Sequence, residues 1–274
     1  MSNPLAKHFR QPTIYLKLPS GGKFWPEGSV ELTATSEVPV YPMSIKDEIL
    51  LKTPDALMNG EGVANMIKSC IPAIKDPYVC PTVDLDAILI AIRLASYGTG
   101  MDIQSSCPAC KETNEFTVNL TSVLDGIRFT GFDSRNISDL TFEFKPQTFK
   151  DLNTANLATF EEQKLLSIVA DESLSELDKN RLFKESFQRL SDLSLSTVIN
   201  CIASITTKEG EKVTDLAQIV EFFNNCDRQT YDDIKKTLDE FAQANKLKPI
   251  SLKCEHCSTE YVNDITFDQA NFFA

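Results

Sequence analysis

Cys107-Pro108-Ala109-Cys110 and Cys254-Glu255-His256-Cys257 are two pairs of cysteines, each with a two-residue spacer, and 143 residues separate them. A two-residue spacer lets one tight turn present two thiolates from the same side. Two such turns complete the tetrahedral shell of soft ligands that Zn²⁺ prefers. One pair alone is weak evidence, but two in one chain predict a single metal site formed by Cys107, Cys110, Cys254 and Cys257.

The sequence after each pair has the character of a strand. Residues 115–120 alternate polar and apolar side chains, and residues 260–265 show a rougher version of the same pattern. We therefore interpret residues 101–120 and 249–274 as the two halves of a split zinc ribbon. The chain between them is then an insertion.

Three alternatives to a zinc site remain open. A thioredoxin-like redox pair would need one motif opening a helix within an α/β unit, and neither motif is placed so. Two disulfides would need an oxidising compartment, and four thiolates also suit iron. With four thiolates no coordination position is free, so a zinc ion here is expected to be structural. His256 is interpreted as an exposed turn residue.

Composition indicates a soluble globular protein that works in a reducing compartment. Hydrophobic residues make up 42% of the 274 positions and charged residues 24%. No apolar run approaches the ~20 residues that span a membrane, and the N-terminus lacks the apolar core of a signal peptide. The other four cysteines are therefore expected to be reduced and mostly in the core, namely Cys70, Cys80, Cys201 and Cys226.

The chain is acidic throughout, with a net charge of −12. Residues 1–120 carry −3, residues 121–250 carry −6 and residues 251–274 carry −3. A groove that follows a phosphate backbone needs clustered basic residues, so nucleic acid is not an expected partner. The one basic patch is small, and it is either a solvated arm or a contact with an acidic protein; it contains Lys7, Arg10, Lys17 and Lys23.

The residue pattern predicts an α+β protein. We expect an extended or β N-terminal arm over residues 1–43 and a helical core over 44–100. The split ribbon and C-terminal tail follow at 101–120 and 249–274, with a mainly helical insertion at 121–248.

Several local roles are also predicted. Ser44 is a plausible N-cap with acids in the following turn, and Thr82 or Asp84 is expected to cap a buried helix. Trp25 is interpreted as a packing anchor. Arg93, within the buried helix, is expected to form a structural ion pair with one of three acids, Asp84, Asp86 or Asp47.

The motifs of common enzymes are missing. The sequence has no phosphate-binding loop, no dinucleotide fingerprint and no nucleophile elbow, and it contains two histidines. We therefore predict a protein without catalytic residues. An enzyme would need a carboxylate pair or a reactive cysteine outside the ribbon, and Cys70 or Cys80 would be tested first.

Three phenylalanines lie in the last eight residues: Phe267, Phe272 and Phe273. Exposed phenylalanine surface is costly, so these side chains are expected to be buried against something. One alternative is that the tail folds back onto its own protein. The other is a partner-binding peptide that enters a groove of a second protein.

An ordered series of short motifs resembles the T4-type phage baseplate family of hub subunits and hub-assembly proteins of contractile tails. The resemblance covers the first 120 residues and the C-terminus. It rests on residues 18–22, 47–51, Pro54, 60–62, Ile67, Cys70, Asp86, Arg93, 96–98, Cys107-Pro108, Cys110, Cys254, Cys257 and 272–273.

The resemblance implies a non-catalytic role in virion assembly, with other tail or baseplate proteins as partners. The favoured hypothesis is a protein that helps to build a baseplate hub. The alternatives are a transient assembly chaperone of the same machinery and a nucleic-acid-binding zinc ribbon. The expected location is the host cytoplasm during assembly, and the virion baseplate if the protein is retained there.

Overall fold

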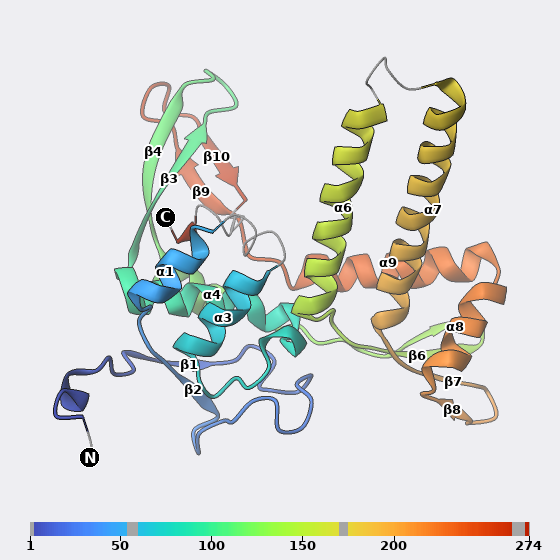
Figure 1. Cartoon of the computed structure of the whole chain (residues 1–274), viewed down its shortest axis with the longest axis horizontal. Coiled ribbons are helices and arrows are strands. Elements are labelled where there is room, and N and C mark those ends of the chain that lie inside the picture. The colour runs from blue at the N-terminus through green and yellow to red at the C-terminus, as the bar shows by residue number, and fades with distance from the viewer. Residues whose placement is uncertain (1–2, 54–59, 170–174, 265–271, 274) are drawn as a thin grey trace. The chain divides into compact units, whose positions relative to one another are not determined.

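The computed structural model describes residues 3–53, 60–169, 175–264 and 272–273, without the side chains of 162–169 and 176–177. It has two compact units, which we describe separately (Figure 1). Unit 1 comprises residues 1–129 and 245–274, and unit 2 comprises residues 130–244. Both contain helices and strands, which confirms the α+β class. The four-part division drawn from the sequence is finer and stays a prediction.

Unit 1 combines short helices with three two-stranded antiparallel sheets. Its elements are β1 (Ile14–Lys17), β2 (Glu37–Val40), α1 (Ile45–Leu51), α3 (Glu61–Cys70), α4 (Thr82–Tyr97), β3 (Gly100–Ser106), β4 (Thr113–Asn119), α5 (Leu120–Gly126), β9 (Ile250–Lys253) and β10 (Glu260–Asn263). Helix α4 lies at the centre: six consecutive apolar residues, 87–92, are at most 3% exposed. A helix that is apolar on more than one side is typical of a core position.

The N-terminus of α4 holds the glycine-rich loop that follows β1. The Asp84 carboxylate accepts hydrogen bonds from the Ser20 amide (2.7 Å), the Ser20 hydroxyl (2.5 Å) and the Trp25 indole (2.8 Å). Burial raises the pKa of Asp84, and the hydrogen bonds from Ser20 and Trp25 act against this. Trp25 is thus a packing anchor as predicted. The predicted cap is wrong, because Pro81 occupies the N-cap position and Asp84 binds the loop instead.

A second buried carboxylate ties the N-terminal segment to α1. Ser44 and Asp47 form a capping box, as predicted for Ser44. Asp47 also accepts hydrogen bonds from Arg10 (3.3 Å) and from Ser69 at the end of α3 (3.0 Å). Arg10 additionally donates to the Pro42 carbonyl at 2.7 Å. Arg10 is therefore engaged within unit 1 and does not belong to a free basic patch.

Asp86 on α4 gives stability a defined pH dependence. Burial raises its pKa from 3.8 to about 6. A raised carboxyl pKa means that the folded state binds the proton more tightly than the unfolded state does. The contribution of this proton to the free energy of unfolding is therefore present at pH 4 and is lost as the pH rises through 6. We expect Asp86→Asn to raise the free energy of unfolding at pH 7.5 by about 1–2 kcal/mol, and not at pH 4.

Urea unfolding at the two pH values measures this effect. The control is Asp125→Asn, at an exposed position of α5 in the same unit. An equal effect of Asp86→Asn at both pH values would mean that the carboxyl does not hold its proton.

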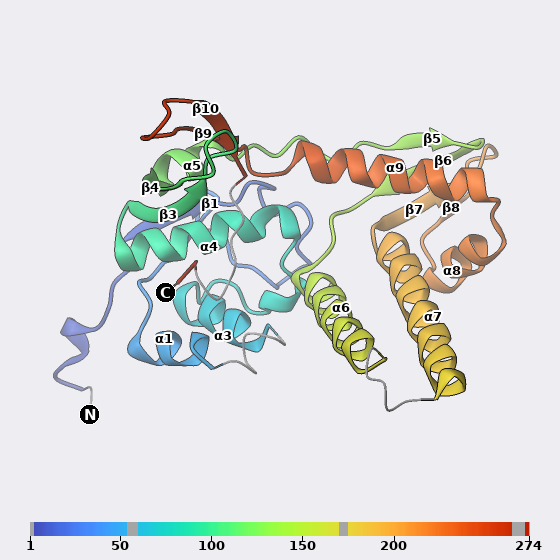
Figure 2. The same cartoon turned by 90° about the horizontal axis from the view of Figure 1, so that it is seen from above.

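Unit 2 is a four-stranded antiparallel sheet with helices. Its elements are β5 (Arg135–Ile137), β6 (Leu140–Phe144), α6 (Phe149–Val169), α7 (Glu176–Asn200), β7 (Ile202–Thr206), β8 (Lys212–Val213), α8 (Leu216–Asn225) and α9 (Arg228–Ala244). The strand order is β5-β6-β7-β8. Helices α6 and α7 pack side by side as an antiparallel pair joined by residues 170–175 (Figures 1 and 2).

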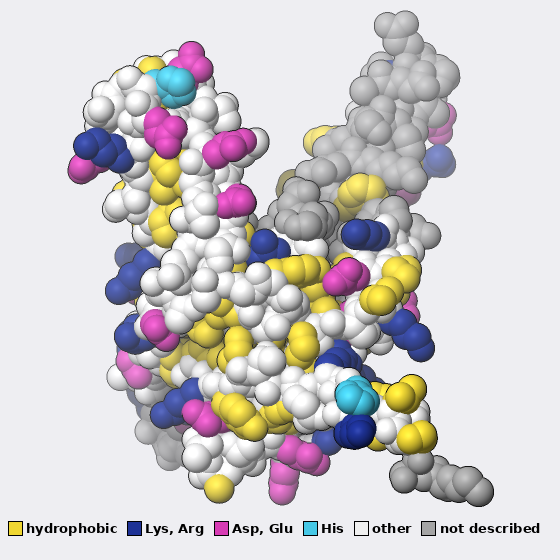
Figure 3. Space-filling view, turned by 90° about the vertical axis from the view of Figure 1, so that its left-hand side faces the viewer, with side chains coloured by type: hydrophobic (Ala, Val, Ile, Leu, Met, Phe, Trp, Pro, Cys, Tyr) yellow, Lys and Arg dark blue, Asp and Glu magenta, His cyan; other side chains and the backbone are white. Residues whose placement is uncertain are grey.

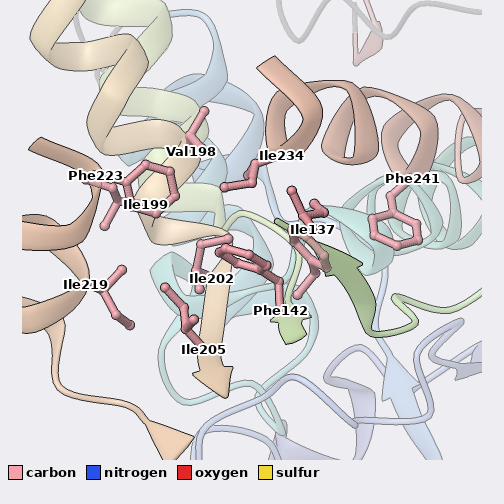
Figure 4. Close-up of a cluster of buried hydrophobic side chains, with 11 residues drawn as sticks. Ile137, Phe142, Val198, Ile199, Ile202, Ile205, Ile219, Phe223, Ile234 and Phe241 are labelled. Atoms are coloured by element: carbon pink, nitrogen blue, oxygen red, sulfur yellow. The ribbon is translucent and has the colours of Figure 1, made fainter. Parts of the chain in front are cut away.

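The core of unit 2 lies where α7, α8 and α9 meet the sheet (Figure 4). Phe142 on β6 is fully buried, and Ile202 and Ile205 on β7 pack beside it. The insertion was predicted to be mainly helical, and strands β7 and β8 were not predicted within it. Asp215 and Asp227 begin α8 and α9 by accepting amide hydrogen bonds from Gln218 and Thr230, as their cap-forming side chains predict.

Within the described residues, no helix is both long enough and apolar enough to cross a membrane.

Candidate metal centre

The two cysteine pairs lie at the ends of two hairpins in unit 1. Strands β3 and β4 pair from Gly100–Asn119 to Ser106–Thr113, and the loop 107–112 joins them. Strands β9 and β10 pair from Ile250–Asn263 to Lys253–Glu260, and the loop 254–259 joins them. Both loops therefore have six residues and begin with a cysteine, which places each pair in the same local setting.

The two loops have the same backbone conformation. In the first, the Cys107 amide donates to the Glu112 carbonyl and the Lys111 amide donates to the Cys107 carbonyl, both at 2.9 Å. In the second, Cys254 pairs with Thr259 and Ser258 with Cys254, again at 2.9 Å. The residue after each second cysteine is left-handed, with φ of 64° at Lys111 and 59° at Ser258. The hairpins are thus two copies of one thiolate-presenting turn.

The four sulfur atoms converge. All four lie within 4.8 Å of one another, and two close approaches cross between the hairpins. Cys107 Sγ is 3.6 Å from Cys257 Sγ, and Cys110 Sγ is 3.6 Å from Cys254 Sγ. A tetrahedral ion with metal–sulfur bonds of 2.3 Å separates its ligands by about 3.8 Å. A disulfide needs about 2.05 Å, and all eight cysteines are free.

The donor set therefore fits one tetrahedral metal ion, and the predicted convergence of Cys107, Cys110, Cys254 and Cys257 is present. The first cysteine of each pair is buried, whereas Cys110 is half-buried and Cys257 is exposed. His256 is exposed and is outside this cluster. Since all four positions of a tetrahedron are taken by thiolates, the arrangement supports structural cross-linking and leaves no site for a substrate.

Local hydrogen bonds favour thiolates at the second turn. The Thr259 hydroxyl lies 3.2 Å from Cys257 Sγ, and together with the Thr259 backbone it lowers the pKa of Cys257 to about 6. The hydrogen bond from the Cys257 amide lowers the pKa of Cys254. At Cys110 the Glu112 backbone acts in the same direction, but burial and the neighbouring sulfurs raise the pKa to about 12. A metal ion held by these four cysteines would need all of them as thiolates, so its binding would release the protons that the sulfurs still carry.

Asn114 connects the two hairpins independently of the metal. Its side chain is 2% exposed, its Oδ1 accepts the Glu255 amide at 2.9 Å, and its Nδ2 donates to the Glu112 carbonyl at 3.1 Å. Asn114, on β4 of the first hairpin, thus holds the second loop in place at the residue after Cys254. The cysteine spacing gave no sign of this residue. The only signal was a polar side chain at an inward position of an alternating strand.

We expect Asn114→Ala to weaken metal affinity about 10- to 100-fold, the usual effect of removing a group that orients metal ligands. The variant leaves the Glu255 amide without its partner and lets one loop move relative to the other. Competition against a chromophoric chelator measures the affinity. Gln104→Ala is the control, since Gln104 is exposed and bonds Glu115 within one hairpin. Unchanged affinity in Asn114→Ala would mean that the thiolates position themselves without help.

The described end of the C-terminal tail packs inside unit 1. Phe272 and Phe273 are 4% and 6% exposed, and their rings meet edge to face at 4.8 Å. Arg93 donates to the Phe272 carbonyl and places its guanidinium 5.4 Å from the Phe272 ring and 5.3 Å from the Tyr97 ring. The Tyr97 hydroxyl donates to the Phe273 carbonyl at 3.4 Å. This arrangement agrees with the folded-back alternative.

A partner-binding role for these phenylalanines stays a prediction, and Phe267 lies outside the described residues. The ion pair predicted for Arg93 is wrong within the described part of the chain. Asp84 accepts hydrogen bonds from Ser20 and Trp25, and Asp47 pairs with Arg10. Arg93 contacts the C-terminal tail instead.

Comparison with known protein families identifies the family of this chain. Residues 11–274 match the family described as T4 bacteriophage base plate protein. The chain belongs to this family. The match includes both cysteine pairs and the whole of unit 2, so it extends beyond the segments that carry the resemblance in the sequence. Comparison with curated proteins and with solved structures gave no match.

Proposed function

We propose that this family member is a non-enzymatic phage protein that acts in the assembly or structure of the baseplate hub of a contractile tail. It works through contacts with other tail and baseplate proteins. The observation that carries the proposal is the family match over residues 11–274. The assignment to the hub rests on the ordered motifs of unit 1 and the C-terminus. The metal is proposed to be Zn²⁺, held by the four cysteines as a structural cross-link.

The chemistry of the remaining cysteines supports a non-enzymatic role. Burial, followed by the charge of Asp47, raises the pKa of Cys70 to about 12. Burial also raises the pKa of Cys80 well above its usual value. A nucleophilic cysteine is a thiolate and is accessible to its substrate. Cys70 and Cys80 are instead buried and protonated, so neither has the properties of a nucleophile.

The charge of the ribbon argues against the nucleic-acid alternative. Residues 100–119 and 250–264 contain six acidic residues and two lysines. In the space-filling view, acidic side chains predominate among the charged groups of the ribbon, at the upper left (Figure 3). Such a surface repels a phosphate backbone. A gel-shift assay with single- and double-stranded DNA at about 50 mM salt is expected to show no complex.

Co-purification tests the proposal directly. The tagged full-length chain is co-expressed with the tail proteins of its phage, and the bound proteins are identified. We expect a baseplate protein to be recovered with it at a fixed ratio. Recovery of none of them, from folded and metal-loaded protein, would contradict the proposed role.

A second measurement separates the resident subunit from the transient chaperone. A structural subunit is found in purified virions at a fixed number of copies per tail. A chaperone is found on assembly intermediates in the host cytoplasm and is missing from the finished virion. Quantitative mass spectrometry of both fractions distinguishes the two.

A further inference from the structure

Helix α7 carries a stripe of exposed apolar side chains. Phe183 is 58% exposed, Phe187 is 66% exposed and Leu190 is 39% exposed. Their spacing of four and three residues places them on one face of the helix, over about 10 Å of its length. Ser186, directly before Phe187, is 6% exposed, so the buried face of α7 is a different one.

The stripe does not belong to the core of unit 2. The residues of α7 that reach that core lie near the helix C-terminus: Leu195, Val198 and Ile199. Two exposed phenylalanines one helical turn apart are costly in water, at roughly 25 cal/mol for each Å². Exposed apolar patches of this kind are typical of sites that bind another protein.

We propose that the stripe binds the same stripe of a second copy of this chain, forming a two-fold dimer with antiparallel α7 helices. The amino-acid order supports this occupant, because it is nearly symmetric about Phe187. Phe183 lies four residues before Phe187 and Leu190 three residues after it. Asn180 and Ser194, both exposed and uncharged, end the stripe seven residues to either side.

A two-fold axis through Phe187 makes the two surfaces identical and self-complementary. Phe187 then stacks on Phe187 of the second copy, and Phe183 lies opposite Leu190 of the second copy. The acidic chain repels its own copies over most of its surface, with a net charge of −12. The stripe adds no like-charge contact of its own, since the positions 180, 183, 187, 190 and 194 carry no charge.

The exposed area sets the expected strength. Taking about 200 Å² for a large, fully exposed side chain, the three side chains offer about 300 Å² of apolar surface per copy. A standard interface buries about 800 Å² per partner, of which roughly 450 Å² is apolar. The stripe supplies about two thirds of that, so the dimer is expected to be reversible, with a micromolar Kd.

Sedimentation velocity of the full-length, metal-loaded protein from about 1 to 100 µM tests the dimer. We expect a concentration-dependent shift from the monomer mass of 30.6 kDa towards twice that value. Phe187→Glu is expected to raise the Kd at least 10-fold, because it brings two carboxylates together at the axis. Leu216→Glu is the matched control, at a 59% exposed position of α8 in the same unit, and it is expected to leave the Kd unchanged.

A charge pair tests the antiparallel register. Phe183→Lys and Leu190→Glu should each weaken the dimer. Both changes in one chain should restore it, because the lysine of each copy then faces the glutamate of the other. Positions 183 and 190 are about 10 Å apart along one helix, which is too far for a direct ion pair within one chain, so the rescue needs two copies.

Three outcomes overturn the proposal. The first is a monomer over the whole concentration range. The second is a dimer that Phe187→Glu leaves intact. The third is a monomer whose α7 stripe binds a different tail protein, which would identify another occupant. Loss of the dimer proposal by any of these outcomes leaves the metal site and the proposed function standing, because neither depends on self-association.

Discussion

Cys254→Ser is expected to remove the metal from unit 1 and to lower its thermal midpoint by about 10–20 °C. The site joins turns that are 143 residues apart. Closing a loop of that length removes conformational entropy from the unfolded chain worth about 5 kcal/mol. For a unit of this size, about 1 kcal/mol corresponds to about 2–4 °C. Serine binds Zn²⁺ poorly, so the cross-link is lost although three cysteines remain.

Calorimetry and metal analysis of purified protein check this prediction. The wild-type chain should contain one metal ion, and elemental analysis distinguishes zinc from iron. Because the chain has two compact units, two transitions are expected, and Cys254→Ser should move only that of unit 1. The control is Cys226→Ser in unit 2, where the thiol donates to the Phe223 carbonyl and is outside the four-cysteine cluster. A Cys254→Ser protein as stable as wild type would show that the four cysteines hold no common ion.

The sequence was most informative where function or local structure depends on spacing. Two residues between cysteines specify a turn that presents two thiolates, so the convergence of the four cysteines was predicted without any knowledge of the fold. Ser44 and Asp47 were similarly readable, because a capping box is completed within one helical turn.

The sequence failed where a residue acts on a distant part of the chain. Asp84 is a plausible helix cap by its position, yet its partners are 64 and 59 residues away in the loop after β1. Asn114 contacts a backbone amide 141 residues away. The hydrogen-bond partner of a buried polar side chain depends on tertiary structure, which a local pattern does not contain.

Strand β7 was missed for a different reason. Ile202–Thr206 is a short apolar run between long helical stretches, and at that length a buried strand and a piece of a buried helix have the same pattern. The β-branched residues within it favoured a strand. The helical periodicity on both sides outweighed that signal, so strand β7 was not predicted.

Phe272→Ala is expected to lower the free energy of unfolding of unit 1 by about 3 kcal/mol. Truncating a buried phenylalanine usually costs about 3–5 kcal/mol. The lower value applies because a chain end can detach while the rest of the unit stays folded, which limits the loss. The substitution also removes one of the two rings that contact the Arg93 guanidinium, 5.4 Å away.

Arg93→Lys provides an independent test of the same contact. Lysine keeps the charge but lacks the planar group that donates to the Phe272 carbonyl and lies against the rings of Phe272 and Tyr97. If the tail belongs to the core of unit 1, both variants should be destabilised, and the double variant should lose less than the sum because the two residues share one contact. Phe9→Ala is the control, at a 57% exposed position of the same unit.

Co-purification with tail proteins then separates the two roles considered for the C-terminal phenylalanines. If the tail serves only the core, Phe272→Ala should bind its partners as the wild-type protein does, provided that the measurement is made where the variant remains folded. In a docking tail, binding is lost while the urea midpoint stays at the wild-type value. The 4% exposure of Phe272 favours the first result, because a ring already covered by its own protein must be released before a partner can bind it, and that release reduces the affinity.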